Sequence, residues 1–167
     1  MHDVTTDTGG GLTAPRLMQF VPNTDFGVEV KFDSTVSAYE VIQGIIIEQD
    51  SNDYIRFDFY YDGTSTHIYS GSFNSGVLGT SSAEGRKNTV ISSGVLNAPL
   101  YLRVKRVGNT WTLSYSTNGT TWTQHHQFTR SMTVKAVGPF GANPQPAATP
   151  PAFSPKVDYF RSIGTGI

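Results

Sequence analysis

The sequence predicts an all-β protein, either an antiparallel β-sandwich or a jelly roll. Hydrophobic and polar residues alternate with a period of two along much of the 167-residue chain, and no stretch of a dozen residues keeps a helical period. Glycine, asparagine and aspartate turns separate these short alternating segments. Regularly spaced short strands of this kind are typical of sandwiches. We therefore expect one sandwich domain over residues 14–167, preceded by a flexible head or linker at residues 1–13.

The first half of the chain contains four predicted strands. Residues 26–32 alternate strictly, and residues 45–49 form the continuous apolar run of a central strand. Residues 54–61 alternate again, and an aspartate–glycine turn joins them to a return strand at residues 66–73. These last two strands predict a hairpin with one polar and one apolar face.

Six further strands are predicted, at residues 89–91, 100–107, 111–115, 122–128, 134–140 and 157–161. Asn118 and Gly119 form the strongest hairpin signal of the chain. The Ser/Gly-rich segment 76–94 is expected to be an exposed loop around its one strand, and the Pro/Ala-rich segment 141–155 a second loop. Trp111 and Trp122 each alternate with polar residues, so we expect both to anchor the core.

Charge and composition exclude several classes of function. Lys and Arg together number 12 and Asp and Glu 13, so the formal net charge is -1 and the chain has no general attraction to nucleic acid. No apolar run approaches the length of about 18 residues that a membrane span needs. Cysteine is absent, which excludes thiolate catalysis and cysteine-based zinc sites. Residues 1–13 carry no signal-peptide pattern and have the composition of a linker between domains.

One group of carboxylates has a spacing that suits glycoside hydrolysis. Glu48 and Asp50 are separated by one residue, so a continuing strand places both on one face, with Asp53 as a third carboxylate beyond them. Residues 51–53 are also typical of a turn, in which Asp50 and Asn52 bond their own backbone. The oxygen atoms of Asp50, Asn52 and Asp53 are in addition the donors that a structural calcium ion takes.

The other enzyme signals are weak. His125 and His126 are neighbours in a predicted strand, so their side chains should point to opposite faces and cannot chelate one metal ion. The sequence contains neither a nucleophile elbow nor a phosphate-binding glycine loop before a helix.

The polar face of the predicted hairpin is the most informative feature. Arg56, Asp58 and Tyr60 stand on one face of one strand, and His67 and Tyr69 on one face of its partner. Such a face suits sugar, because rings stack on the C–H groups of a pyranose while charged and amide groups bond its hydroxyls. The alternative is an ordinary solvent-exposed sheet face. The candidate sugar-contacting residues are Gln43, Arg56, Asp58, Tyr60, His67, Tyr69 and Lys105.

Each of these side chains has an expected role. Tyr60 or Tyr69 is the stacking platform, and Arg56, Asp58 and Gln43 bond the hydroxyls. We therefore expect Tyr69→Ala or Arg56→Ala to abolish binding while the melting temperature stays nearly unchanged.

The segment from Leu102 to Trp122 carries the clearest resemblance to a known family. It is similar to the concanavalin A-like β-sandwich appended to bacterial glycosidases, such as the C-terminal domain of β-xylosidases and related standalone modules. Residues 14–19, 44–57 and 137–143 resemble the opening strands, the central hairpin and the last strands of that family.

The resemblance implies a non-catalytic, carbohydrate-binding domain of a secreted bacterial multidomain enzyme. Its partners would be a polysaccharide or glycan and a neighbouring catalytic domain in the parent chain, and its location extracellular or at the cell surface. Several members of the wider lectin and glucanase superfamily carry a structural calcium ion. Two rivals remain open. A structural domain that packs on a catalytic domain would expose an apolar patch, and a jelly-roll hydrolase or lyase would need Glu48 and Asp50 to face a cleft.

Overall fold

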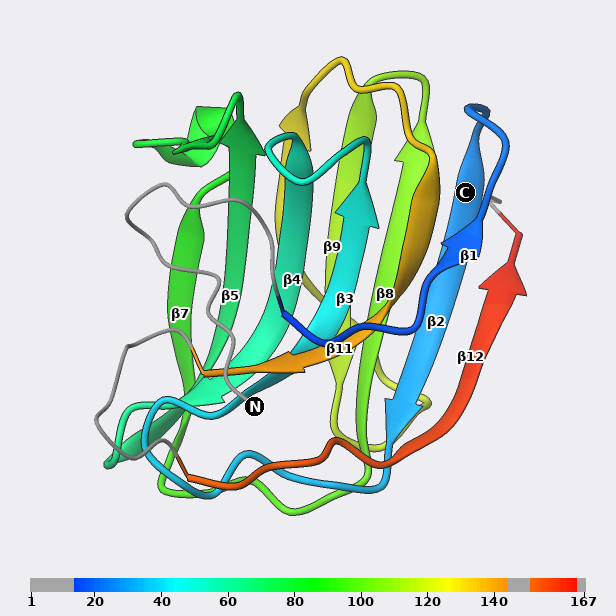
Figure 1. Ribbon diagram of the computed structural model, residues 1–167. Helices are drawn as coiled ribbons and strands as arrows, with labels where there is room; N and C mark the ends of the chain where they lie inside the picture. The colour runs from blue at the N-terminus through cyan, green and yellow to red at the C-terminus, as the bar shows by residue number, and fades with distance from the viewer. Residues whose placement is uncertain (1–13, 144–150, 165–167) are drawn as a thin grey trace.

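The computed structural model describes residues 14–143 and 151–164, which form twelve strands and one turn of 3₁₀ helix (Figure 1). The elements are β1 (Gln19–Phe20), β2 (Phe26–Phe32), β3 (Ile42–Glu48), β4 (Tyr54–Tyr61), β5 (Ser65–Asn74), β6 (Val77–Leu78), η1 (Ser82–Glu84), β7 (Lys87–Ser93), β8 (Leu100–Val107), β9 (Thr110–Ser116), β10 (Thr123–Thr129), β11 (Ala136–Ala142) and β12 (Val157–Ile163). The described residues contain no helix that is long and apolar enough to span a bilayer. The predicted all-β class is confirmed.

The strands form two antiparallel sheets that stack face to face (Figure 1). Sheet A has the order β1-β11-β3-β4-β5-β6, and β7 also pairs with β5. Sheet B has the order β10-β9-β8-β2-β12. Because each alternating strand presents one apolar face, two such sheets bury those faces against each other and give the predicted sandwich.

The hydrophobic core lies between the inner faces of the two sheets. Phe57 and Phe59 of β4 contribute from sheet A, and Val30 of β2 and Leu102 of β8 contribute from sheet B. All four side chains are completely buried. The residues that alternate with them therefore stand on the outer faces of the sheets.

The two tryptophans have different environments. Trp111 is completely buried, and its indole N–H donates to the carbonyl of Arg130 at 3.0 Å, so the predicted core position is confirmed. Trp122 is only half-buried, and the guanidinium carbon of Arg103 lies 3.6 Å from its ring centroid. The expectation of a core position for Trp122 is wrong, because this residue precedes β10 and lies against the outer face of sheet B.

Residues 14–20 cover one edge of sheet A. β1 pairs with β11, and the N–H of Leu17 donates to the carbonyl of Pro139 at 3.1 Å. Gly138 allows this close approach, because a Cβ atom there would lie 2.0 Å from the carbonyl oxygen of Leu17.

The segment 76–94 is more ordered than the exposed loop that its composition predicts. It contains β6, η1 and all of β7, which spans Lys87–Ser93 rather than residues 89–91 alone. β7 pairs with β5 along six residues, from Ser70 opposite Lys87 to Ser65 opposite Ser93. This pairing holds residues 80–88 beside the outer face of sheet A.

Candidate functional site

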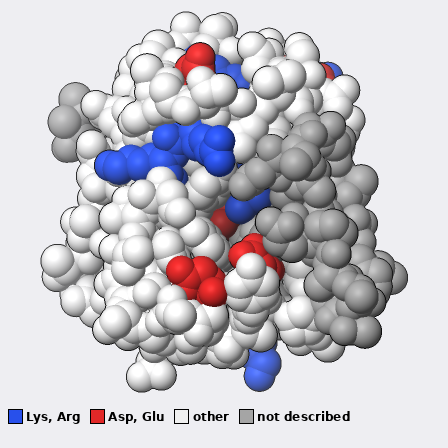
Figure 2. All heavy atoms as spheres, turned by 90° about the vertical axis from the view of Figure 1, so that its left-hand side faces the viewer, with Lys and Arg blue, Asp and Glu red and all other residues white. Residues whose placement is uncertain are grey.

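A pocket of about 380 Å³ opens on the outer face of sheet A (Figure 2). Strands β4 and β5 form its floor, residues 80–88 form a wall, and Glu40 stands at its rim. Its volume falls within the range of about 300–1,000 Å³ that is usual for small-molecule sites. The lining residues are Glu40, Arg56, Tyr60, Tyr69, Thr80, Ser81, Ser82, Arg86, Lys87 and Asn88.

The hairpin register brings five of the seven predicted residues together on this face. Asp58 lies directly opposite Tyr69, and Tyr60 directly opposite His67, so the two pairs are cross-strand neighbours. Arg56 comes two residues before Asp58 on the same face. Since the inner side of both strands belongs to the core, the alternation in the sequence is sufficient to place all five side chains.

Arg56 and Asp58 form a buried ion pair in the floor. The Nε atom of Arg56 donates to Oδ2 of Asp58 at 2.8 Å, and the two side chains are 3% and 0% exposed. The guanidinium carbon also lies 4.6 Å from the ring centroid of Tyr69. A buried pair of this kind fixes both partners in one geometry, because either charge alone would be costly to bury.

This burial contradicts one expectation from the sequence. Arg56 is 3% exposed and Tyr69 5% exposed, so replacing either by alanine removes a packed side chain and disturbs a buried charge. The melting temperature should therefore fall, and less buried residues of the pocket are better probes of binding.

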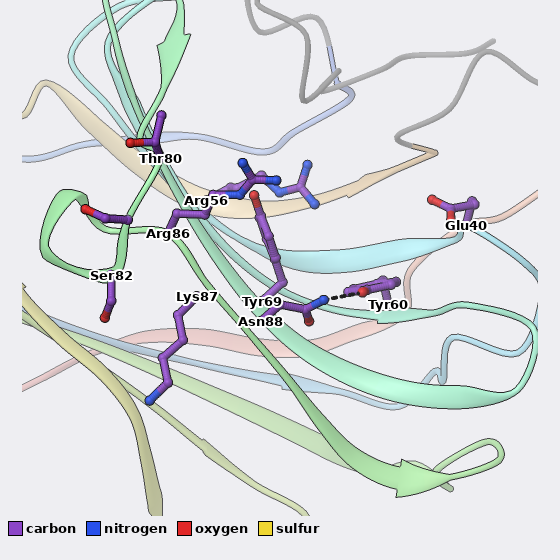
Figure 3. Close-up of a pocket in the computed structure, with 10 residues that line it drawn as sticks. Glu40, Arg56, Tyr60, Tyr69, Thr80, Ser82, Arg86, Lys87 and Asn88 are labelled. Atoms are coloured by element: carbon purple, nitrogen blue, oxygen red, sulfur yellow. Dashed lines mark hydrogen bonds between the residues drawn. The ribbon is translucent and has the colours of Figure 1, made fainter.

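A hydrogen-bonded network holds the second aromatic platform. The ring of Tyr60 stacks on that of His67 with centroids 4.5 Å apart, and the amide nitrogen of Asn88 donates to the Tyr60 hydroxyl at 2.7 Å (Figure 3). His67 in turn contacts Oδ2 of Asp62 at 2.8 Å through Nε2 and Oδ1 of Asn88 at 3.1 Å through Nδ1. Burial raises the pKa of Tyr60, so its hydroxyl remains a donor at neutral pH.

The wall of the pocket is anchored on the seam between the two sheets. His126 lies 2.8 Å from the Ser70 hydroxyl through Nδ1, and its Nε2 donates to the carbonyl of Ser82 at 2.9 Å. Lys87 donates through Nζ to the carbonyl of His125 at 2.6 Å. The polar contacts of β10 therefore set the position of η1 and the start of β7.

The two histidines do not point to opposite faces as the sequence predicts. A bulge between Gln124 and His126 breaks the alternation of β10, and His125 and His126 are both 4% exposed. His125 stacks on Phe57 with ring centroids 5.8 Å apart. Burial lowers the pKa of His125 to about 4, with the nearby Lys87 ammonium as a second cause.

Gln43 and Lys105 do not belong to the pocket. Gln43 has the same strand parity as Ile45, so it lies on the inner face of β3, where it is completely buried and bonds Ser34 through both amide atoms at 2.7 and 2.8 Å. Lys105 stands on β8 of sheet B, across the sandwich from the pocket. The placement of these two residues with the other five is wrong.

The candidate carboxylate pair does not face a cleft. Glu48 is bound by Arg16, with Nε 2.9 Å and Nη2 3.2 Å from its two oxygens. Asp50 lies in the turn and accepts the backbone N–H groups of Asn52 and Asp53 at 2.9 and 3.0 Å. Asp50 therefore caps a turn, as the alternative interpretation of the sequence predicts.

The same turn does not fit a calcium ion. The Arg130 guanidinium lies 3.1 Å from Oδ1 of Asp53, and Asp50 directs its oxygen to backbone donors. A divalent cation needs these oxygens to converge on one point without a competing cation. Among residues 14–143 and 151–164, no group of three His, Asp or Glu side chains is arranged to hold a metal.

Sequence reasoning missed the whole wall and rim of the pocket. Asn88 and Arg86 fall in a segment assigned to an exposed loop, and Glu40 precedes its strand. The available signal was Gly85, which has a φ of 88° and ends η1. A glycine of this kind before a polar strand marks a tight turn, but it does not say which sheet face the turn covers.

No protein-family model matches the chain, and no curated protein matches its sequence. Among solved structures, the chain is similar to a xylan β-1,4-xylosidase from Bacillus halodurans, with a TM-score of 0.64 and 13% identity over 90% of this chain and 30% of the other. It is similar to a homodimeric agglutinin from chicken liver, with a TM-score of 0.53 and 13% identity over 88% of this chain and 100% of the other. A functionally unknown protein from Saccharomyces cerevisiae gives a TM-score of 0.62 and 14% identity over 86% and 75%.

These likenesses define the fold. The chain is a concanavalin A-like antiparallel β-sandwich, as the resemblance of residues 102–122 predicts. It spans about a third of the xylosidase and the full length of the agglutinin.

Proposed function

We propose that this domain binds glycans in the pocket on the outer face of sheet A and carries no catalysis of its own. The observation that supports this proposal most directly is that Arg56, Tyr60 and Tyr69 together line one pocket of about 380 Å³. Asp58 and His67 lie beside them on the same sheet face, opposite Tyr69 and Tyr60. A binding site for a neutral, hydroxyl-rich ligand needs fixed donors and acceptors beside an apolar ring.

The pocket supplies each of these elements. The network through Asn88 holds Tyr60 in position, so the ring needs no reordering when a pyranose stacks on it. Thr80 adds a hydroxyl on the wall, which donates to Glu84 and leaves its oxygen to accept from a ligand. Preorganised groups of this kind lower the entropic cost of binding.

Binding without cleavage is supported by the state of the carboxylates. Asp58 is held by Arg56 and Glu48 by Arg16, and both contacts are 2.8–2.9 Å long. Glycoside hydrolysis requires two carboxyl groups that flank the scissile bond. A carboxylate committed to an arginine is poorly suited to protonate or attack a substrate.

The likeness to known structures also supports the proposal. One similar protein is an agglutinin, and another is a xylosidase in which the matched part is 30% of the chain. We propose, on that basis, that the domain belongs to an extracellular bacterial multidomain enzyme and delivers a neighbouring catalytic domain to polysaccharide.

The test is retention of the purified domain on insoluble polysaccharides and on a glycan array, with calcium and again with a chelator. We expect retention in both conditions. We also expect a loss of about tenfold in affinity for Tyr60→Ala, which removes the half-buried stacking ring. The matched control is Tyr101→Ala, a half-buried tyrosine of sheet B, which should bind normally. Equal loss in both variants would contradict the proposed site, and loss in chelator would restore the calcium prediction.

A second candidate function is packing against a neighbouring domain without independent sugar binding. Leu17 and Phe20 are 76% and 92% exposed at the covered edge of sheet A, next to a groove of about 490 Å³ lined by Phe140, Phe153 and Val157 among others. Exposed apolar groups of this kind mark protein interfaces. This candidate becomes the better one if no polysaccharide retains the domain.

A further inference from the structure

Positive charge is concentrated at one end of the pocket. Figure 2 shows Lys and Arg atoms on one side of the hollow and Asp and Glu atoms on the other. Figure 3 shows Arg56 and Arg86 at the end where the Tyr69 hydroxyl lies, and Glu40 at the opposite end. Asp58 pairs with Arg56, so among residues 14–143 and 151–164 the charge of Arg86 is the surplus at this end.

Arg86 is exposed, and no ion pair or hydrogen bond of its side chain occurs among the residues that the structure describes. Its neighbours in sequence do not neutralise it. Glu84 turns back and accepts the backbone N–H and the hydroxyl of Thr80 at 2.6 and 2.9 Å. These hydrogen bonds lower the pKa of Glu84, so the carboxylate stays ionised and committed to Thr80.

The backbone before Arg86 is fixed in place. A Cβ atom on Gly85 would lie 2.6 Å from Cβ of Ser72 and 2.8 Å from a ring carbon of Phe128. Its φ of 88° also suits only glycine without strain. On the other side, Lys87 points away from the cationic end (Figure 3) and donates to the carbonyl of His125. The backbone of Arg86 is therefore held between two fixed neighbours, Gly85 and Lys87.

We infer that the pocket takes an anionic sugar, with a carboxylate or sulfate group on Arg86 and the sugar ring on the tyrosine platform. This inference rests on the proposed glycan-binding function and names its ligand class. A guanidinium donates two parallel N–H groups to two oxygens of a carboxylate or a sulfate group. Arg56 and Tyr69 line the same end of the pocket as Arg86, and Glu40 lies at the far end.

The experiment measures affinity for matched pairs of polymers at low ionic strength. One pair is polygalacturonate and its carboxyl-reduced form, and the other is dextran sulfate and dextran. We expect the wild-type domain to bind at least one anionic polymer about tenfold more tightly than its neutral partner, since charge-assisted hydrogen bonds are the stronger kind. The pair that shows the preference distinguishes a carboxylate from a sulfate ligand.

The variant Arg86→Gln should lose about tenfold in affinity for the anionic polymer and bind the neutral one unchanged. Lys105→Gln is the matched control, because it removes one positive charge from sheet B on the other side of the sandwich. The melting temperature of Arg86→Gln should equal that of the wild type, as Arg86 is exposed.

Each other outcome overturns the inference. Equal losses in Arg86→Gln and Lys105→Gln would mean general charge attraction. Retention on neutral polymers without a preference for the anionic partners would reject the anionic ligand and leave the proposed glycan-binding function in place. Absence of retention on every polymer would reject both.

Discussion

The outer faces of the two sheets carry the same residue types, but their ion pairs differ in burial. On sheet A, Arg56 and Asp58 are both buried, under a pocket with a wall. On sheet B, Glu29 is buried and accepts from Arg103 at 2.5 Å and Arg161 at 2.7 Å, but these two arginine side chains are 29% and 57% exposed. The difference lies in burial and in the segment that covers the pair, since both faces carry arginine, a carboxylate and aromatic rings.

A polar sheet face becomes a candidate site when a further segment encloses it. In the cluster on Glu29, the Arg161 side chain is 57% exposed, and the partly exposed Arg103 guanidinium lies against the Trp122 ring. The pair on sheet A has residues 80–88 beside it, which β7 and the seam histidines hold in place. Strand alternation supplies the floor of a site, and a segment from outside the hairpin supplies the enclosure.

The largest expected difference is in the cost of losing each carboxylate. Asp58→Ala should lower the free energy of unfolding by about 3–5 kcal/mol, because the guanidinium of Arg56 stays buried without its carboxylate. Glu29→Ala should cost only about 1–2 kcal/mol, since the guanidinium groups of Arg103 and Arg161 are already partly exposed to water. Urea unfolding at pH 7 measures both. Equal losses would show that the two faces do not differ in this respect.

Acid should weaken the seam that anchors the pocket wall. Burial lowers the pKa of His125 to about 4, whereas the unfolded chain titrates near pH 6.5. The unfolded state therefore binds more protons between these values, and the contribution that is complete above pH 6.5 is lost as the pH falls toward 4. Urea unfolding at pH 7 and pH 4.5 should differ by about 2–3 kcal/mol from this cause. His125→Leu should remove that part of the difference. If the variant lost as much stability between pH 7 and pH 4.5 as the wild type does, the prediction would be contradicted.

A smaller effect should come from strain at the rim of the pocket. Glu40 is not glycine, yet its φ is 59°, in the left-handed region. Glu40→Gly should therefore be more stable than Glu40→Ala by about 1 kcal/mol, because alanine keeps the strained backbone and glycine does not. Thermal unfolding of the two variants gives this difference directly. An alanine variant of equal or higher stability would mean that the rim is not strained.

The smallest effect is expected on the exposed side of sheet B. Lys31 bonds Asp158 at 2.8 Å and Asp33 at 3.1 Å, and these carboxylates raise its pKa. Lys31→Ala should nevertheless change the melting temperature by less than about 3 °C, since solvent and salt screen surface pairs. The change should disappear in about 1 M salt. A larger shift that survives salt would show that this cluster is as rigid as the floor of the pocket.

The fold was predictable because the strand period is local information. The alternation of residues 54–61 and their turn places Arg56, Asp58 and Tyr60 on one face, and the hairpin adds His67 and Tyr69. The same rule also places Gln43 inward, since it lies two residues before Ile45 on one strand. Gln43 was wrongly placed in the pocket because its amide suits sugar hydroxyls, whereas the alternation of the strand decides which face its side chain takes.

The rest of the site depends on information that no short segment contains. Lys105 lies on an alternating strand, as Arg56 does, but the alternation of polar and apolar residues does not reveal which sheet a strand joins. The bulge that buries His125 breaks the period at one residue. Arg86 reaches the pocket because β7 pairs with β5, a contact that no local pattern in the sequence predicts. Tertiary placement decides these three cases.

The contact between Gly138 and Leu17 has a consequence for the behaviour of the protein in solution. With residues 14–20 in place, the backbone of β11 already has partners along this side. A side chain at residue 138 would push that cover away, because its Cβ atom would meet Leu17 at 2.0 Å. β11 would then present an open row of hydrogen-bonding groups, the template on which sheets of separate molecules join and precipitate. One hydrogen atom in place of a methyl group thus helps to keep the protein from self-association.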